Sequence, residues 1–162
     1  MKYTQNPIEE RKYIRDGRSP IPLYEVTSRV MSANKGKDTR PEIALRKYLF
    51  HHGLRGYRIH WKQVPGRPDI AYPRRKIAIF IHGCFWHRCP TCDLPLPKTN
   101  TEFWKLKFER NQARDRLKQE KLEALGWKVI VIWECQIKKD LVSSFNVIHA
   151  QFDMLIDQRL DI

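Results

Sequence analysis

Residues 64–92 read VPGRPDIAYPRRKIAIFIHGCFWHRCPTC, and they hold three of the four cysteines and two of the six histidines of the chain. Apolar and β-branched residues predict a short strand over Ile70–Tyr72 and an almost wholly apolar strand over Ile77–His82. Pro73–Lys76, with one proline and three basic residues, predicts the turn between them. The stretch therefore predicts a buried hairpin that ends in a loop crowded with ligand-type side chains.

Asp69 lies at the start of this hairpin, directly after Pro68. A hairpin centred on residues 74–75 would place the Asp69 carboxylate opposite Phe80 and Ile81, beside backbone carbonyls at the end of a central strand. Hard oxygen ligands with room for water are the ligands that Mg²⁺ prefers. Aspartate is also common after proline in turns that bind no metal, so both interpretations stay open at this point.

The chain is strongly basic, because 31 lysines and arginines against 18 aspartates and glutamates give its 162 residues a formal net charge of +13. This excess indicates a polyanionic partner, with nucleic acid first and an acidic membrane surface second. No segment approaches the length of a transmembrane helix, and the N-terminus MKYTQNPIEERK has no apolar signal core. We therefore expect a cytoplasmic protein, in a compartment where disulfides are rare.

The length fits one domain with a core of its own. Residues 1–25 contain three prolines and show no clear period, so we expect a basic, loosely ordered arm there and a single domain over residues 26–162. A short helix is predicted over Val26–Asn34. Thr39-Arg-Pro-Glu42 then has the form of a capping box, which predicts a second helix that stops near Gly53. Glu42 thus has a capping explanation, with a functional role as the alternative.

The rest of the chain alternates between strand and helix patterns. A half-exposed strand is predicted over residues 57–62, and a buried strand over Val129–Trp133. A long helix is predicted from Thr101 to Leu125, before Gly126, with an apolar face at Phe103, Leu106, Ala113, Leu117 and Ala124. Asp140 should cap a final helix, whose apolar face holds Leu141, Phe145, Ile148, Phe152 and Leu155. The order predicts an α/β fold, a mixed central sheet flanked by helices, with the long helix as a crossover.

Cys84-x4-Cys89-x2-Cys92 and the later Cys135 use every cysteine of the chain. Four thiolates around one tetrahedral ion would make a closed structural zinc site. The Cys-x2-Cys pair is the specific part, because a cysteine at the end of a buried strand, such as Cys135, is often simply buried. The pattern favours zinc over unliganded thiols, with the ion holding the loop of residues 84–92 in place.

His82 and His87 lie on either side of the first cysteine. A histidine near a phosphate can take a proton from water or stabilise charge. Taken singly, each is better explained as a surface or metal-adjacent histidine without a catalytic role.

Five segments in order, GRPDI, FIHGCFWH, TEFW, ERNQARD and GWKVIVIWEC, resemble the successive motifs of the very short patch repair (Vsr) endonucleases. The resemblance covers roughly Val30 to Cys135. It implies a restriction-endonuclease-like core in which the usual Glu-x-Lys of the second strand is replaced, here by Phe80-Ile81-His82. It also implies Mg²⁺-dependent nicking of DNA beside the thymine of a T:G mismatch, the lesion left when 5-methylcytosine deaminates.

Carried over residue by residue, the resemblance implies roles for the site. Asp69 should bind Mg²⁺ through its carboxylate, with the carbonyl of Ile81 as a second ligand. His87 should be the base that activates water, oriented by Asp115. His82 should lie near the scissile phosphate.

The resemblance also implies roles at the edge of the site. Glu42 should hold a water on the ion or the catalytic histidine, which is compatible with capping its helix. Phe85, Trp86 and Trp104 match an aromatic wedge that enters the base stack beside the mismatch, and Met31 matches a residue inserted from the opposite groove. Unstacking costs least at a mismatch, so a wedge supplies selectivity as well as affinity. The alternative is that Trp86 and Trp104 pack on each other under the zinc loop.

Two features depart from the family pattern. Family members often have a histidine among the zinc ligands, whereas this chain offers four cysteines and one extra residue in the loop. The arm and the final helix lie outside the resemblance.

Three functions remain in competition. The first is a mismatch-directed nicking enzyme, expected to act as a monomer on double-stranded DNA with a T:G mismatch, away from membranes, and with MutL-type repair proteins as a further candidate partner. The second is a sequence-specific restriction endonuclease on the same core, which would cut both strands of paired DNA. The third is a catalytically silent, zinc-containing DNA-binding protein. The aromatic wedge favours the first.

Overall fold

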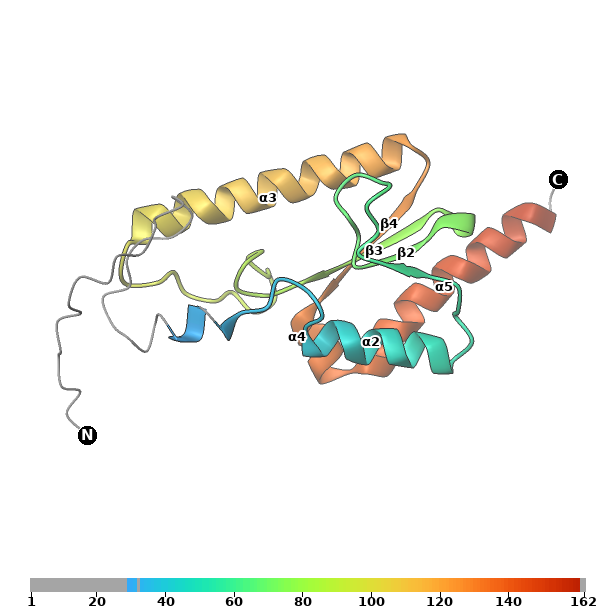
Figure 1. The fold of residues 1–162 in the computed structure, drawn as a ribbon, viewed down its shortest axis with the longest axis horizontal. Coiled ribbons are helices and arrows are strands. Elements are labelled where there is room, and N and C mark those ends of the chain that lie inside the picture. The colour runs from blue at the N-terminus through green and yellow to red at the C-terminus, as the bar shows by residue number, and fades with distance from the viewer. Residues whose placement is uncertain (1–28, 32, 161–162) are drawn as a thin grey trace.

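The structure is a computed structural model that describes residues 29–31 and 33–160, with side chains up to Met154 (Figure 1). The predicted arm over residues 1–25 lies outside the described residues, and so do residues 26–28 of the first predicted helix and the side chain of Leu155. Residues 29–31 and 33 are helical, in agreement with that prediction.

The centre of the fold is a four-stranded mixed sheet in the order β1-β2-β3-β4. β2 (Ile70–Tyr72) and β3 (Ile77–His82) form the predicted antiparallel hairpin, closed by the 3₁₀ turn η1 (Pro73–Arg75). β4 (Lys128–Trp133) pairs in parallel with β3 along its whole length. The hairpin and the fourth strand are confirmed at the predicted positions, although in β4 only Ile130 and Ile132 are buried.

The edge strand β1 (Arg58–Ile59) is shorter than predicted. Gly56 has φ +82° before it and His60 has φ +45° after it. Both residues leave the extended region of backbone space, so the alternating pattern of residues 57–62 gives only two residues of strand. The prediction of a longer half-exposed strand was wrong, and the left-handed backbone at His60 is the physical reason.

Helices cover both faces of the sheet (Figure 1). α2 (Arg40–His51), α4 (Glu134–Lys139) and α5 (Leu141–Leu160) pack together on one face, and α3 (Thr101–Ala124) runs along the other. The larger core cluster lies under α2, α4 and α5 and consists of Leu45, Leu49, Ile70, Tyr72, Ile77, Ile79, Ile130, Ile132, Ile137, Ile148 and Phe152. The smaller cluster lies under α3 and consists of Ala71, Ala78, Phe80, Leu122 and Trp127. Because both faces are covered, the central strands are apolar on both sides.

The two helix caps behave differently. Asp140 caps α5 as predicted, accepting a hydrogen bond from the Ser143 N–H at 2.9 Å. At α2, the Thr39 hydroxyl donates to the Glu42 carboxylate at 2.8 Å and does not bond the backbone. The capping-box prediction was therefore wrong in its geometry, because Glu42 draws the hydroxyl to its own charged oxygens. The short helix α4 was not predicted.

α3 has the predicted length but buries the opposite face. Its buried residues are Trp104, Phe108, Asp115 and Leu122, whereas Leu106 and Leu117 of the predicted face are exposed. Burying two large aromatic rings removes more apolar surface from water than burying alanines at positions 113 and 124. Counting apolar residues along one face therefore selected the wrong side of this helix.

None of the helices in the described part of the chain combines the length and the apolar character of a membrane span.

Two leucines of α3 test this orientation. Leu122 is 0 % exposed and Leu117 is 49 % exposed, on the same helix and with the same side chain. We expect Leu122→Ala to lower the free energy of unfolding by about 2–5 kcal/mol, because it leaves a cavity in the core. Leu117→Ala should change it by less than about 0.5 kcal/mol. Urea unfolding of both variants measures the difference, and equal losses would contradict the orientation of α3.

Candidate functional site

The site forms at one edge of the sheet. β3 and β4 are parallel and paired from Ile77–Lys128 to His82–Trp133, so their carboxyl ends meet. The loop after β3 carries His87 and three cysteines, and the start of α4 after β4 carries Cys135. Asp69 reaches the same edge, because it precedes the antiparallel strand β2. The register of the hairpin thus gathers residues that lie up to 66 positions apart in the chain.

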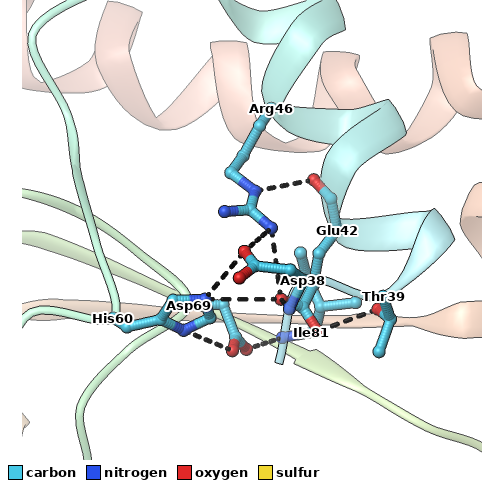
Figure 2. Close-up of polar contacts among 7 residues, drawn as sticks. All are labelled: Asp38, Thr39, Glu42, Arg46, His60, Asp69 and Ile81. Carbon is cyan, nitrogen blue, oxygen red and sulfur yellow. Dashed lines mark hydrogen bonds and ion pairs between the residues drawn. The ribbon is translucent and has the colours of Figure 1, made fainter. Parts of the chain in front are cut away.

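Asp69 is held against the end of β3, as predicted (Figure 2). Its Oδ2 atom accepts a hydrogen bond from the Ile81 N–H at 2.7 Å. Burial raises the pKa of Asp69 to about 6; the Ile81 hydrogen bond lowers it in part, and the nearby Glu42 carboxylate raises it further. A carboxylate in this position is poorly solvated and has a like charge nearby, which are conditions that a bound cation would relieve.

Glu42 and Asp38 at the start of α2 form the acidic wall opposite Asp69. Glu42 is 5 % exposed and accepts hydrogen bonds from the Asp38 N–H at 2.9 Å and from the Thr39 hydroxyl. The Arg46 guanidinium lies 2.8 Å from Asp38 Oδ1 and 3.4 Å from Glu42 Oε2. Hydrogen bonds from Arg46 and then His60 lower the pKa of Asp38. These acids are therefore partly neutralised from within the protein.

A second cluster joins His82, His87 and Asp115. His87 Nδ1 lies 2.5 Å from Asp115 Oδ2, and the His82 and His87 rings stack with centroids 4.1 Å apart. Burial acts to raise the pKa of Asp115, but the hydrogen bond and charge of His87 hold it below its usual value. The Lys118 ammonium lies 3.3 Å from Asp115 Oδ1.

His82 is buried beside this pair. Burial, and then the charge of His87, lower the pKa of His82 to about 4. His82 is therefore neutral at physiological pH. It can offer a ring nitrogen as a neutral donor or acceptor.

Both clusters line a single cleft of about 970 Å³. Residues of the α2 start, the end of β3, the following loop and α3 contribute to its wall. The lining includes Asp69, Glu42, His82, His87 and Asp115. The five predicted catalytic side chains thus share one cleft. Within it, Glu42 contacts Asp38, Thr39, Arg46 and His60 and not His87.

The four cysteines converge beside this cleft. Their sulfur atoms all lie within 4.8 Å of one another, and the Sγ atoms of Cys89 and Cys135 are 3.8 Å apart. Tetrahedral zinc with Zn–S bonds of about 2.3 Å requires S···S distances of about 3.8 Å. Burial acts to raise the pKa of Cys89, but backbone N–H groups of Cys92 and Thr91 and neighbouring thiols lower it to about 7. The set has the composition and spacing of a four-thiolate metal site.

The aromatic residues after Cys84 pack together. Phe85 contacts Trp86, Trp104 and Phe108 with ring centroids 5.1, 5.5 and 5.2 Å apart, and Trp86 and Trp104 are 6.0 Å apart. Trp104 is 6 % exposed, whereas Phe85 and Trp86 are half-buried. The Lys107 ammonium lies over the rings of Trp86 and Trp104. In this structure the two tryptophans pack on each other, as in the alternative considered above.

The structure also shows residues that the sequence did not single out. His60 and Asp38 lie beside Asp69 and Glu42, with Arg46 behind them, and Lys118 lies beside Asp115. In the sequence, His60 is only one polar position of an alternating pattern, and no spacing rule connects position 38 with positions 60 and 69.

Met31, the residue predicted to act from the opposite groove, is half-buried. Its sulfur accepts a hydrogen bond from the Asn34 side chain at 3.9 Å.

Comparison with known proteins identifies the family. Residues 24–93 match the family model described as DNA mismatch endonuclease Vsr. The DNA mismatch endonuclease Vsr of Escherichia coli K12 is 39 % identical over 111 residues, which is 68 % of this chain and 70 % of that protein. This chain belongs to the Vsr endonuclease family.

Two further relatives share most of their length with the chain. The type II nicking enzyme V.XorIIP of Xanthomonas oryzae is 39 % identical over 79 % of this chain and 90 % of its own length. The type II nicking enzyme V.NmeAIP of Neisseria meningitidis is 43 % identical over 70 % of this chain and 80 % of its own length. Membership of the Vsr family makes the chain an endonuclease, and the relatives support nicking of DNA.

The raised pKa of Asp69 predicts that this residue destabilises the fold at neutral pH. The pKa of Asp69 is about 6 in the fold, above its ordinary value of 3.8, so the folded protein binds this proton more tightly than the unfolded chain does. The resulting stabilisation of the fold is complete below pH 3.8 and is lost as pH rises through 6. Without added Mg²⁺, Asp69→Asn should raise the free energy of unfolding at pH 7.5 by up to about 3 kcal/mol. The asparagine oxygen can keep the Ile81 hydrogen bond.

Thermal unfolding at pH 7.5 and pH 4 provides the measurement. The gain from Asp69→Asn should shrink towards zero at pH 4, and the exposed Asp153→Asn should change little at either pH. A gain that is equal at both pH values would contradict a buried, poorly solvated Asp69 carboxylate.

Proposed function

We propose that this Vsr-family chain nicks one strand of double-stranded DNA beside the thymine of a T:G mismatch, in a Mg²⁺-dependent reaction. The observation that carries the proposal is that one cleft is lined both by the Asp69 carboxylate and by the hydrogen-bonded pair of His87 and Asp115. The net charge of +13 supports attraction to the DNA backbone. The name of the family model and of the E. coli relative supports the mismatch as substrate.

The residues around Asp69 fit a hard divalent cation. Asp69 offers carboxylate oxygens, and the Ile81 N–H points towards it. In a strand, the N–H and C=O groups of one residue point to the same side, so the Ile81 carbonyl is directed to the same edge. Carboxylate and carbonyl oxygens with space for water suit Mg²⁺. Bound there, the ion would polarise the scissile phosphate and neutralise its developing charge.

His87 is the proposed general base. Its Nδ1 atom is engaged by Asp115, which fixes the ring and leaves Nε2 to take a proton from water. Asp115 keeps its charge and can stabilise the protonated ring, because its pKa is held low. His82, neutral and stacked on His87, lines the wall where the phosphate would lie. Glu42 completes the acidic wall on the other side of Asp69.

Two further parts of the proposal concern structure. The four-stranded sheet with its helices is the proposed restriction-endonuclease-like core, with Phe80-Ile81-His82 at the position of the usual Glu-x-Lys. The four cysteines are the proposed zinc ligands, because their spacing fits tetrahedral thiolate coordination. Zinc there would hold the loop that carries His87.

The aromatic cluster is the proposed mismatch wedge, with Met31 acting from the opposite groove. Phe85 and Trp86 are half-buried, and Trp104 lies beneath them. Their insertion would exchange ring packing within the cluster for stacking on bases, which contributes about 1–3 kcal/mol per base. A T:G pair lowers the unstacking cost, so this exchange is most favourable at the mismatch.

The function is tested on duplexes with one central T:G pair, randomised flanks and a different label on each strand. We expect a single nick on the thymine strand with Mg²⁺ and none with EDTA. Asp69→Ala should abolish nicking and leave binding largely intact, and His87→Ala should slow nicking by about 10²–10⁴-fold. His149→Ala, at a partly exposed histidine of α5 that does not line the cleft, serves as the control.

Other outcomes select the competing functions. Cleavage of both strands of fully paired duplexes would indicate a restriction endonuclease. Binding without cleavage, with any divalent ion, would indicate a non-catalytic DNA-binding protein. Nicking by His87→Ala at the wild-type rate would refute the assignment of the base.

The zinc proposal predicts about one zinc per chain in metal analysis of the purified protein. Cys92→Ser should lose the ion and lower the melting temperature by about 5–10 °C, because ion binding stabilises the folded state. Thr91→Ala, in the same loop, should keep both the ion and the stability. A folded, active and zinc-free preparation would overturn the zinc assignment.

A further inference from the structure

His60 lies between Asp69 and the acidic wall formed by Asp38 and Glu42 (Figure 2). Its Nδ1 atom is 3.8 Å from Asp69 Oδ1. Its Nε2 atom is 3.2 Å from Asp38 Oδ1 and 3.8 Å from Glu42 Oε2. The ring therefore presents one nitrogen to Asp69 and the other nitrogen to the acidic wall across the cleft.

The backbone holds His60 in an uncommon conformation at this place. Its φ of +45° is in the left-handed region, which residues other than glycine rarely adopt. Its N–H donates to the carbonyl of Asp69 at 3.3 Å. Such a conformation persists only where the surrounding structure fixes it, and it clusters at functional sites. The ring is thus built into the site from the same backbone that carries Asp69.

The far end of the contact chain is anchored in α2. Asp38 accepts a hydrogen bond from the Arg46 guanidinium at 2.8 Å, and Arg46 Nε donates to the carbonyl of Glu42 at 3.1 Å. Arg46 is itself buried. A chain of contacts therefore runs from Arg46 in α2 through Asp38 and His60 to Asp69 at the edge of the sheet.

We infer that His60 is a positioning residue, whose ring fixes the orientation of the Asp69 carboxylate for a divalent cation and ties it to α2. The inference rests on the proposed function, which gives Asp69 that cation. The Ile81 N–H fixes one carboxylate oxygen of Asp69, and His60 faces the other oxygen. The hydrogen bond holds the first oxygen, and the ring beside the second oxygen opposes rotation of the carboxylate away from the cleft.

Groups that orient a metal ligand typically change metal affinity or activity by 10–100-fold when they are removed. The left-handed backbone makes glycine the suitable replacement, because His60→Ala would add backbone strain to the loss of the ring. We expect His60→Gly to raise the Mg²⁺ concentration for half-maximal nicking by about 10–100-fold. At saturating Mg²⁺, its nicking rate should return to within about threefold of the wild-type rate, and its DNA binding in EDTA should stay within about twofold.

His60→Asn is the rescue variant. Its amide places a polar nitrogen near the position of Nδ1, and asparagine tolerates left-handed backbone. We expect it to bring the Mg²⁺ requirement to within about threefold of wild type. The control His51→Ala, on an exposed histidine at the end of α2, should match wild type throughout.

A second readout avoids nicking altogether. Mn²⁺ binding to the protein without DNA, followed by electron paramagnetic resonance, should weaken in His60→Gly by the same factor and recover in His60→Asn. A wild-type Mg²⁺ requirement and Mn²⁺ affinity in His60→Gly would overturn the inference. So would a loss of nicking that saturating Mg²⁺ does not restore, or a failure of His60→Asn to improve on His60→Gly.

Failure of the proposed function gives a different pattern. A wild-type protein that binds Mn²⁺ yet nicks none of the duplexes would remove the proposed function, while the Mn²⁺ titrations would still decide the role of His60. Wild-type nicking with an unchanged Mg²⁺ requirement in His60→Gly would remove the inference alone.

Discussion

The parallel pairing of β3 with β4 is the constraint on which the site depends. Two parallel strands cannot be joined by a tight turn, so the chain must cross the sheet, and here α3 makes that crossing. The same pairing brings the carboxyl ends of both strands to one edge, which places Cys135 among the cysteines that follow β3. The returning helix passes over that edge and delivers Asp115 to His87. One pairing therefore assembles the thiol cluster and the histidine–aspartate pair.

The cleft gathers several acidic side chains within a strongly basic protein. Burying Asp69 near Glu42 is unfavourable, and the pKa of about 6 for Asp69 records that cost. The buried Arg46 offsets part of it through Asp38 and Glu42, without contacting Asp69 directly. This arrangement leaves the Asp69 carboxylate poorly solvated and accessible from the cleft. A buried carboxylate without a cation lowers the stability of the fold, and a bound cation would restore that stability. The stability of the fold is therefore linked to the function proposed for the site.

One face of α3 contributes side chains both to the hydrophobic core and to the candidate site. Trp104 and Phe108 pack under Phe85, Asp115 holds His87, and Leu122 fills the core under the sheet. The helix therefore couples the loop that carries the proposed base to the hydrophobic core. Its exposed leucines at positions 106 and 117 take no part in this packing.

The sequence by itself determined most of the local elements and the family, although it did not predict α4 and made β1 too long. Periodicity and turn residues placed β2, β3, β4 and α3, because these elements depend on interactions between near neighbours. The ordered motifs indicated Asp69, His82, His87 and Asp115, and the number and spacing of the cysteines indicated the thiol cluster. Tertiary structure alone decided which face of α3 is buried, since Trp104 and Leu117 compete for a partner that lies far away in the chain. It also decided the contacts of His60 with Asp38 and Asp69: positions 38, 60 and 69 follow no common period, and only the hairpin register and the docking of α2 bring them together.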